Sequence, residues 1–508
     1  MLKLMTSDRT NASRLWLLVV PILLFAAWRA GLYLGYDALW YDEHASIYTA
    51  GGAHYGPLSP AEIWTRVQNG DPSHTPGFSW VLAGWGGLAG WSDVAGRALA
   101  WLCGLLAIAW TYRLGRDALS PLAGVLAALL LASSYLFLYY LHELRMYSLL
   151  ALCAVVCLWA YFRMMHGRAH VWIKFAFIFS LAIALYTHYL SLAMLLALGL
   201  YHLTLLWQRP RHWREWWQIG LLTGVALVLY LPWLITGMEA LRSRIGDSGT
   251  GATYGSLEVL TVTPHIFANR GWPLLLPIGA FALLQWRRPA LRLLLFWTVA
   301  AFLTLLAVNT LRPFIISYRY ILVLWPAAAV LAGIGLARLA ETPSFGRLAA
   351  VGLVTAWVIL GFVRADPIIN NNYISGMGLR SVLNTLSQQA RPEDVAVFDV
   401  APPHQFIERV MEYYTAELAP RSMLIDLDLD PDSNDYQQQA ASILANAPYV
   451  WLTIAPRLPE APYRTAFEQA LADANYTLCG MVVDYPELHL LLYRHEDAVD
   501  ERGFACPA

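Results

Sequence analysis

The fold is decided by residues 15–44, LWLLVVPILLFAAWRAGLYLGYDALWYDEH, where a long apolar run passes directly into a polar, acidic segment. Residues 15–35 carry a single charge, Arg29. A helix needs about 20 mostly apolar residues to cross a bilayer, because the hydrocarbon core is about 30 Å thick and each residue rises about 1.5 Å. The run continues through Trp28 and Tyr33 without a small-residue cleavage site, so it predicts a retained anchor helix.

Similar apolar runs recur as far as residue 364. The whole chain is 58% hydrophobic and 14% charged, whereas soluble domains are about 45–50% apolar and about 25% charged. This composition excludes a single soluble globule. We predict an α-helical multi-pass membrane protein with about 11 transmembrane helices, at residues 15–35, 94–112, 120–140, 147–165, 171–187, 189–207, 217–236, 271–286, 293–310, 320–340 and 348–364.

The charges divide the chain into two domains. Residues 1–364 carry 26 Lys or Arg against 14 Asp or Glu, a net charge of +12, and residues 365–508 carry 8 against 21, a net charge of -13. The second part has no spanning run. It alternates short strands with helical stretches, which predicts a soluble α/β domain. We expect strands at 395–400, 423–427, 449–454 and 488–493, and helices at 403–418, 434–446 and 461–474.

Arginine-rich loops predict the orientation, because cytoplasmic loops are enriched in Lys and Arg. Five basic loops fall on the side of the N-terminus, provided that the short run 78–91 does not cross the membrane. The N-terminus is then cytoplasmic. Residues 36–91 form a first extracytoplasmic loop with interfacial helices, and residues 365–508 form an extracytoplasmic domain. Cys479 and Cys506 of that domain can pair or stay free, and the sequence leaves this open.

Ionisable side chains gather at the predicted outer face, where such groups mark functional sites. Asp42 and Glu43 follow the first span, and His74 lies in the proline turn of residues 71–76. The acidic pair has two interpretations, a catalytic carboxylate or a simple helix cap. His74 is either a ligand for a metal or an anion, or a lone structural histidine.

A second group of candidate residues lies at the end of the third predicted span and at the boundaries of later spans. His142, Glu143, Arg145 and Tyr147 place an acid, a base, a fixed cation and a phenol within two helical turns. An Arg–Glu pair flanked by interfacial tyrosines is the structural alternative. Further polar residues occur at breaks between apolar runs, and outward arginines there suit either a phosphate ligand or a lipid headgroup. These residues are His188, Arg312, Arg319 and Tyr320.

The ordered set of these motifs resembles the GT-C membrane glycosyltransferases, and among them the protein O-mannosyltransferases and the lipid A aminoarabinose transferase. The resemblance rests on the Asp42-Glu43 pair, the His74 turn, the run Tyr139-Tyr140-Leu141-His142-Glu143-Leu144-Arg145-Met146-Tyr147, and Arg319-Tyr320 before a late helix that contains proline. It covers roughly residues 10–364. The C-terminal domain is not covered by this resemblance.

The resemblance implies an inverting hexosyl- or pentosyltransferase that moves a sugar from a polyprenyl-phosphate carrier to a glycolipid, polysaccharide or protein. It implies Asp42 as the general base, Glu43 as its positioning partner, and Arg145 and Arg319, with Tyr147 and Tyr320, as ligands of the donor phosphate. The candidate substrate-binding residues are His142, Glu143 and His188. Relatives carry Glu at the position of His74 and some bind a divalent metal there, so no cofactor is certain and His74 is a metal candidate only.

Two other functions fit the same composition. A transporter or flippase for a lipid-linked saccharide would also have many spans, but it should carry ionisable groups at mid-membrane depth. A non-catalytic assembly protein could act through the C-terminal domain, although the retained Asp42 argues against this. We expect the bacterial inner membrane as the location. The expected partners are membrane lipids, the polyprenyl-phosphate sugar and its acceptor, and not nucleic acid.

Overall fold

The computed structural model describes residues 14–70, 72–207, 213–243, 253–343, 345–372, 378–398, 413–414, 418, 421–424, 433–454, 462–484, 488–498, 503–504 and 506. The chain divides into two compact units. The membrane unit comprises Met1–Leu34 and Ser46–Ile369, and the C-terminal unit comprises Gly35–Ala45 and Asn370–Ala508. The short segment Gly35–Ala45 is thus grouped with the end of the chain, which the sequence did not predict.

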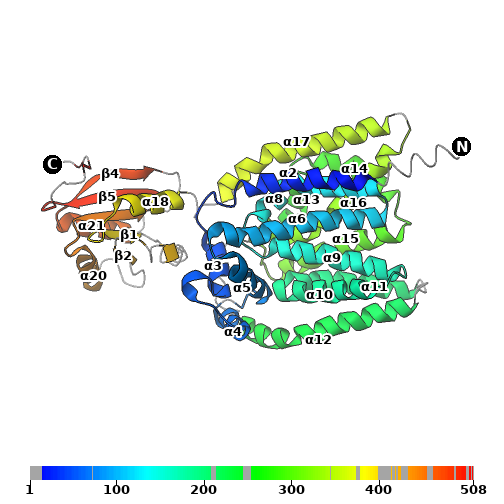
Figure 1. The fold of residues 1–508 in the computed structure, drawn as a ribbon, viewed down its shortest axis with the longest axis horizontal. Coiled ribbons are helices and arrows are strands. Elements are labelled where there is room, and N and C mark those ends of the chain that lie inside the picture. Colours follow the sequence, from blue (N-terminus) through cyan, green and yellow to red (C-terminus); the bar gives the residue numbers. More distant parts are fainter. Residues whose placement is uncertain are drawn as a thin grey trace. The chain divides into compact units, whose positions relative to one another are not determined.

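The membrane unit is helical throughout its described residues, and helices α6, α9, α10 and α11 lie side by side with nearly parallel axes (Figure 1). The first half of its elements are η1 (Leu15–Leu18), α2 (Val19–Gly31), α3 (Tyr41–Ala50, which begins in the C-terminal unit), η2 (Ala53–Tyr55), α4 (Pro60–Gly70), α5 (Gly77–Ala89), α6 (Asp93–Ala118), α7 (Pro121–Ala132), α8 (Tyr135–Leu141) and α9 (Tyr147–Met165). The rest are α10 (Val171–Thr187), α11 (Leu190–Trp207), α12 (Trp213–Ser243), α13 (Ser256–Phe267), η3 (Trp272–Leu274), α14 (Leu275–Leu283), α15 (Pro289–Leu311), η4 (Tyr318–Leu324), α16 (Trp325–Ala340) and α17 (Gly346–Asn372).

The predicted fold class is confirmed, with apolar helices at all eleven predicted runs. Among the described residues, 7 helical segments are long and apolar enough to span a membrane, and two bent pairs would raise this to 9. The bent pairs are α7 with α8, at 71°, and α13 with η3 and α14, at 78°. The two remaining runs form the shorter apolar helices Leu15–Gly31 and Val171–Thr187. The number of crossings therefore stays a prediction. Helix α5 has 13 residues and a length of about 20 Å, less than the hydrocarbon thickness.

Local sequence explains where these helices start and how closely they pack. Ser92 and Ser120 cap α6 and α7 by accepting hydrogen bonds from Ala95 N and Ala123 N, and Pro121 stands at the first turn of α7. Gly115 of α6 faces Gly124 of α7, where an added Cβ would lie 2.8 Å from the Gly124 Cα. This close approach needs glycine on both helices.

Burial separates central helices from peripheral ones. The spanning windows of α9 and of η4 with α16 are 78% and 83% buried, whereas those of α12 and α17 are 22% buried. The central helices begin at Tyr147 and Tyr318, next to Arg145 and Arg319. The candidate site residues are therefore attached to the most rigidly packed part of the membrane unit.

One buried asparagine fixes the bend between α7 and α8. Asn269 is 0% exposed; its Nδ2 donates to the carbonyls of Ser133 (3.0 Å) and Trp357 (3.1 Å), and its Oδ1 accepts from Tyr135 N (3.1 Å). These bonds satisfy backbone groups that the bend removes from helical pairing. The bend aims α8 at the turn that carries His142 to Met146.

The C-terminal unit contains a five-stranded sheet with the order β2-β1-β3-β5-β4. Strand β1 pairs parallel to β2 and β3, whereas β5 pairs antiparallel to β3 and β4. Its elements are α18 (Leu379–Gln389), β1 (Val395–Phe398), β2 (Arg421–Leu424), α20 (Asn434–Leu444), β3 (Tyr449–Ile454), α21 (Pro462–Asp473), β4 (Tyr476–Asp484) and β5 (His489–His495).

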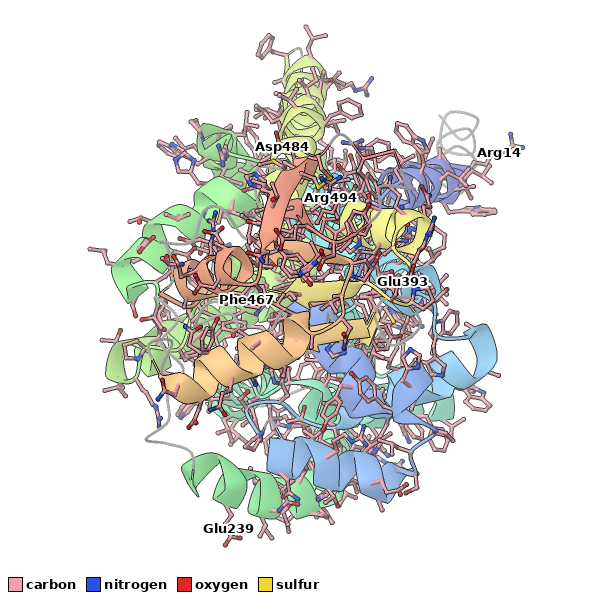
Figure 2. The ribbon with its side chains drawn as sticks, turned by 90° about the vertical axis from the view of Figure 1, so that its left-hand side faces the viewer. Arg14, Glu239, Glu393, Phe467, Asp484 and Arg494 are labelled. Carbon is pink, nitrogen blue, oxygen red and sulfur yellow. A yellow bond between two sulfur atoms is a disulfide. The ribbon has the colours of Figure 1, made fainter. Side chains whose placement is uncertain are left out.

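The predicted α/β domain is confirmed, with two elements missed. Helices α20 and α21 pack on one face of the sheet and α18 on the other; Phe467 of α21, labelled in Figure 2, is 1% exposed in the first cluster. Strand β4 and helix α18 were not predicted. Most of the helix expected at 403–418, and residues 399–400 and 425–427 of two expected strands, lie outside the described residues. Cys479 of β4 is disulfide-bonded to Cys506.

Candidate functional site

The turn between α8 and α9 presents the first cation of the site. The turn is tight, because Arg145 N donates to Glu143 O at 2.7 Å. It is also tied to the helix ends, since Ser148 Oγ donates to Tyr140 O at 2.7 Å. Arg145 is 5% exposed, and its two terminal nitrogens reach different segments. One donates to Ser46 Oγ of α3 at 3.3 Å, and the other contacts His74 Nε2 at 2.9 Å.

The contact between Arg145 and His74 shows which ring nitrogen of His74 accepts a hydrogen bond and which donates one. A guanidinium carries donors only, so His74 Nε2 must be the acceptor. His74 Nδ1 lies 3.1 Å from Ser73 Oγ, which then accepts a hydrogen bond from the Nδ1–H group. The Nε2 lone pair that a metal would need is engaged by Arg145.

The metal predicted as a candidate does not fit this arrangement. Among the described residues no group of three or more His, Cys, Asp and Glu side chains is placed to hold a metal ion. Asp71, the first residue of the proline turn, lies outside the described residues.

Arg319 supplies the second cation, from the start of η4. Ser317 caps this short helix by accepting from Arg319 N, and Arg319 is 9% exposed. Its Nη1 lies 3.8 Å from Glu143 Oε1, and Glu143 is itself 1% exposed. The guanidinium carbon lies over the rings of Tyr147 (5.5 Å) and Tyr320 (5.8 Å). Two arginines with one carboxylate leave this buried group with a net positive charge.

Aromatic and imidazole rings connect the two arginines. Tyr147 lies 6.0 Å from His188 and 6.3 Å from Tyr320, measured between ring centroids. His188 lies 5.9 Å from Tyr320 and 6.1 Å from His74. Seven predicted site residues of the membrane unit thus form one cluster, which we call the arginine cluster: His74, Glu143, Arg145, Tyr147, His188, Arg319 and Tyr320.

An apolar cavity of about 570 Å³ opens beside the arginine cluster. His74, His188 and Tyr320 line one part of it together with Arg312, and apolar side chains of α11 and α15 line the rest, among them Leu192, Leu196, Leu305 and Val308. The cavity therefore combines polar and charged side chains with an apolar lining from α11 and α15. It suits a ligand with an anionic head and a hydrocarbon tail.

His142 does not join the arginine cluster. It is 1% exposed and packs against the rings of Tyr33 (5.3 Å) and Tyr139 (5.4 Å), and its Nδ1 lies 3.2 Å from Leu138 O. Burial, and secondly the charge of Arg97, lowers the pKa of His142 to about 3. Its predicted role in binding substrate stays a prediction, and its contacts are those of a packed, neutral histidine.

Asp42 and Glu43 occupy the first turn of α3, in the part of the helix grouped with the C-terminal unit. Glu43 is 0% exposed, and one carboxylate oxygen accepts from Trp40 N at 3.3 Å. This is the capping contact that the sequence offered as the alternative role. Asp42 is half-buried. The chemical roles of both residues stay predictions.

The sequence did not point to several residues that hold the site in place. Tyr189 Oη donates to Pro72 O at 3.1 Å and accepts from Trp233 Nε1 at 3.1 Å, which fastens the turn of His74 to α12. Asn309 Oδ1 accepts from Phe314 N and Ile315 N, both at 2.9 Å, and so shapes the segment before Arg319. Asn309 is an amide residue within the apolar run 293–310, and this exception in the sequence could have indicated its structural role.

Comparison with known proteins supports the resemblance. The model of the dolichyl-phosphate-mannose-protein mannosyltransferase family matches residues 73–236, about a third of the chain. ArnT from Cupriavidus metallidurans in the apo state is 15% identical, with a TM-score of 0.60 over 93% of this chain and 97% of that chain. ArnT bound to undecaprenyl phosphate is 16% identical, with a TM-score of 0.61 over 96% of this chain and 99% of that chain. No curated protein matches the sequence. The chain has the fold of ArnT, and its resemblance to the GT-C membrane glycosyltransferases is confirmed.

Proposed function

We propose that this multi-pass membrane protein is an inverting glycosyltransferase, which moves a sugar from a polyprenyl-phosphate carrier to a hydroxyl of a glycolipid, polysaccharide or protein acceptor. The observation that carries the proposal is the arginine cluster at the polar end of an apolar cavity. The solved relative that binds undecaprenyl phosphate has the same fold. Neither the sugar nor the acceptor follows from the geometry.

The donor phosphate would bind between Arg145 and Arg319. Guanidinium groups hold phosphate oxygens through paired, charge-assisted hydrogen bonds. Both arginines are at least nine-tenths buried, so their charge acts in a medium that screens it less than water does. The polyprenyl tail would run along the apolar cavity between α11 and α15, with His188, Tyr320 and Arg312 near the head group.

Transfer would proceed as a single displacement at the anomeric carbon. Asp42, as its carboxylate, takes the proton from the acceptor hydroxyl, and the oxygen attacks the anomeric carbon opposite the phosphate. The bond from that carbon to the phosphate oxygen breaks, and its electrons stay on the phosphate, where Arg145 and Arg319 stabilise the developing charge. Polyprenyl phosphate leaves, and the sugar has inverted configuration.

The placement of buried charges favours transfer over transport. The buried charged side chains of the described membrane unit are Arg29, Arg97, Glu143, Arg145 and Arg319. Arg29 is in the last turn of α2, Arg97 is near the start of α6, and the other three are outside the long helices or at a helix start. A transporter would need such groups at mid-membrane depth.

The disulfide supports an extracytoplasmic location for the C-terminal unit. Structural disulfides persist in oxidising compartments and are rare in the cytosol, and Cys479 is bonded to Cys506. We place the protein in the bacterial inner membrane with the N-terminus in the cytoplasm. Labelling of a Ser73→Cys variant in intact cells by an impermeant maleimide tests this. Labelling only after permeabilisation would reverse the orientation.

The activity is tested with purified protein, radiolabelled undecaprenyl-phosphate sugars and a membrane extract as acceptor. The expected result is transfer of label by the wild type and an Asp93→Asn control, and loss of transfer in an Arg145→Gln, Arg319→Gln double variant. Asp93 is an acidic residue in the first turn of another helix, α6. Equal transfer by the double variant would overturn the assigned phosphate site.

A further inference from the structure

The segment before Asp42 is held within the C-terminal unit by buried contacts with residues that follow the membrane unit in the sequence. Asp37 is 6% exposed, and its Oδ1 accepts from Arg380 N at 3.2 Å and from Ala38 N at 2.8 Å. Arg380 Nη2 donates to Asp37 O at 3.0 Å. Leu39 N donates to Tyr414 Oη at 2.7 Å. Residues far apart in the sequence thus hold the backbone of residues 37–39 at several points.

Packing reinforces these hydrogen bonds. Ala38 is 1% exposed and belongs to the apolar cluster between α18 and the sheet, with Leu379 and Val382. Because Asp37 accepts from the first turn of α18, its negative charge also lies at the positive end of that helix dipole. His44 lies against the ring of Tyr413, at 5.2 Å between centroids. The segment is therefore fastened on both sides of Asp42.

We propose that the C-terminal unit acts as a positioning device for the catalytic segment, with Asp37, Arg380 and Tyr414 as its positioning residues. The proposal rests on the proposed role of Asp42 as base. Terminal turns of helices fray unless they are held, and Asp42 lies in the first turn of α3. A base must be held close to its productive geometry, and a displacement of about 1 Å can lower a rate about a hundredfold.

The test compares the kinetics of full-length variants in the transfer assay. Arg380→Ala is expected to lower kcat at least tenfold and to leave KM for the donor within twofold, because the donor is bound by residues of the membrane unit. Arg380→Lys, which keeps a donor to Asp37, should recover part of kcat. Arg464→Ala is the matched control, since Arg464 pairs with Glu468 along α21.

Two outcomes would overturn the proposal. One is a kcat of Arg380→Ala within twofold of wild type. The other is a loss that vanishes when rates are divided by the folded fraction from size-exclusion chromatography. If Asp42→Asn is inactive while Arg380→Ala is fully active, only the positioning role fails. If Asp42→Asn is active, the assigned base fails.

A second, independent feature lies at the other end of the helix bundle, where arginines surround one aspartate. Asp117 near the end of α6 is 8% exposed in its side chain, and it pairs with Arg116 (2.9 Å) and Arg163 (3.3 Å). Trp159 Nε1 donates to the same carboxylate at 2.9 Å. Arg113 stacks over Trp159 at 4.3 Å and over Trp110 at 4.7 Å. Three guanidinium groups with one carboxylate form an ordered group with two net positive charges.

An exposed apolar stripe leads to these arginines. Leu102 and Leu106 are 38% and 51% exposed. At about 100° per residue they share one face of α6 with the exposed Arg113. The distance along the helix from Leu102 to Arg113 is about 16 Å, close to half of the hydrocarbon thickness, which is the depth of one lipid leaflet. Topology alone would need the positive charges but not the carboxylate and tryptophan that order them.

We infer that this face binds a phospholipid with an anionic headgroup. The acyl chain would lie along Leu102 and Leu106, and the phosphate would bind Arg113 and Arg116.

Native mass spectrometry of the purified protein tests this with phosphatidylglycerol, with phosphatidylcholine of the same chains, and with inorganic phosphate. Phosphatidylglycerol should bind at least tenfold more tightly than the other two. The Arg113→Gln, Arg116→Gln variant should lose this preference, whereas the Arg287→Gln, Arg288→Gln control should keep it. Equal binding of the two lipids would overturn the inference. So would equal binding of phosphatidylglycerol by the wild type and the Arg113→Gln, Arg116→Gln variant, or binding of inorganic phosphate alone.

Discussion

Replacement of Arg145 separates the effect of its charge from the effect of its shape. In the structure one terminal nitrogen donates to Ser46 and the other contacts His74. These contacts fix the plane of the forked guanidinium group. Lysine keeps the charge but cannot reproduce this fork. Glutamine removes the charge as well.

The magnitudes follow from the hydrogen bonds that each variant loses. A hydrogen bond to a charged group contributes about 1.5–3 kcal/mol, so the loss of one such bond in Arg145→Lys should lower kcat/KM about 10- to 150-fold. Arg145→Gln also loses a buried charge facing the leaving phosphate. Removal of such a stabilising group lowers kcat about 100- to 1000-fold or more. The order wild type, Lys, Gln is therefore expected.

The assay is initial-rate transfer from a radiolabelled undecaprenyl-phosphate sugar at several donor concentrations. Arg66→Gln is the control, because Arg66 contacts the carbonyl and ring of Tyr48 and is not part of the arginine cluster. It should stay within threefold of wild type. A kcat/KM for Arg145→Gln within threefold of wild type would refute the reasoning, as would a Lys variant less active than the Gln variant.

Three further predictions concern groups around the site. The pKa of His142 is about 3 in the folded protein and about 6.5 in an unfolded chain, so the unfolded state binds more protons between these values. The free energy of unfolding therefore decreases as the pH falls below about 6.5, by about 1.4 kcal/mol per pH unit. The melting temperature of His142→Gln should fall less steeply than that of the wild type from pH 7 to 5, and parallel curves would contradict this. Because His74 Nε2 accepts from Arg145, exhaustive dialysis against a chelator should leave the transfer rate within twofold, and restoration of a lost rate by a divalent metal would contradict it. Tyr189→Phe removes the hydrogen bond to Pro72 and should lower kcat/KM about tenfold, which corresponds to about 1.4 kcal/mol. Tyr230→Phe is the control, because the buried Tyr230 hydroxyl has no hydrogen-bond partner in the described structure, and it should leave kcat/KM unchanged. Equal effects of the two variants would contradict the prediction.

Much of the membrane fold was predictable because a single rule governs it. A spanning helix must be apolar over a fixed length, so the eleven runs read from the sequence coincide with helices. The bends between α7 and α8 and between α13 and η3 were not predictable. The bend between α7 and α8 depends on Asn269, which is distant in sequence from the carbonyls of Ser133 and Trp357 that it binds.

The candidate site shows the same division. Ionisable groups at the ends of apolar runs are costly to bury in a membrane, and this rule indicated Arg145, Arg319 and their neighbours. In the structure these residues lie close together. His142 packs apart from them, against Tyr33 and Tyr139, and its predicted role stays a prediction. The attachment of Asp37 to Arg380 could not be foreseen, since hydrogen bonds between segments so far apart leave no periodic signal in either segment.

The central claim is that Asp42 removes the proton from the acceptor, and one measurement tests it directly. Single-turnover transfer is followed at saturating donor for wild type, Asp42→Asn and the Asp93→Asn control. Asn keeps the size of the side chain but cannot accept the proton, so the account predicts a fall of at least a hundredfold for Asp42→Asn, with unchanged donor binding and an unaffected control. Transfer by Asp42→Asn at the wild-type rate would contradict the account.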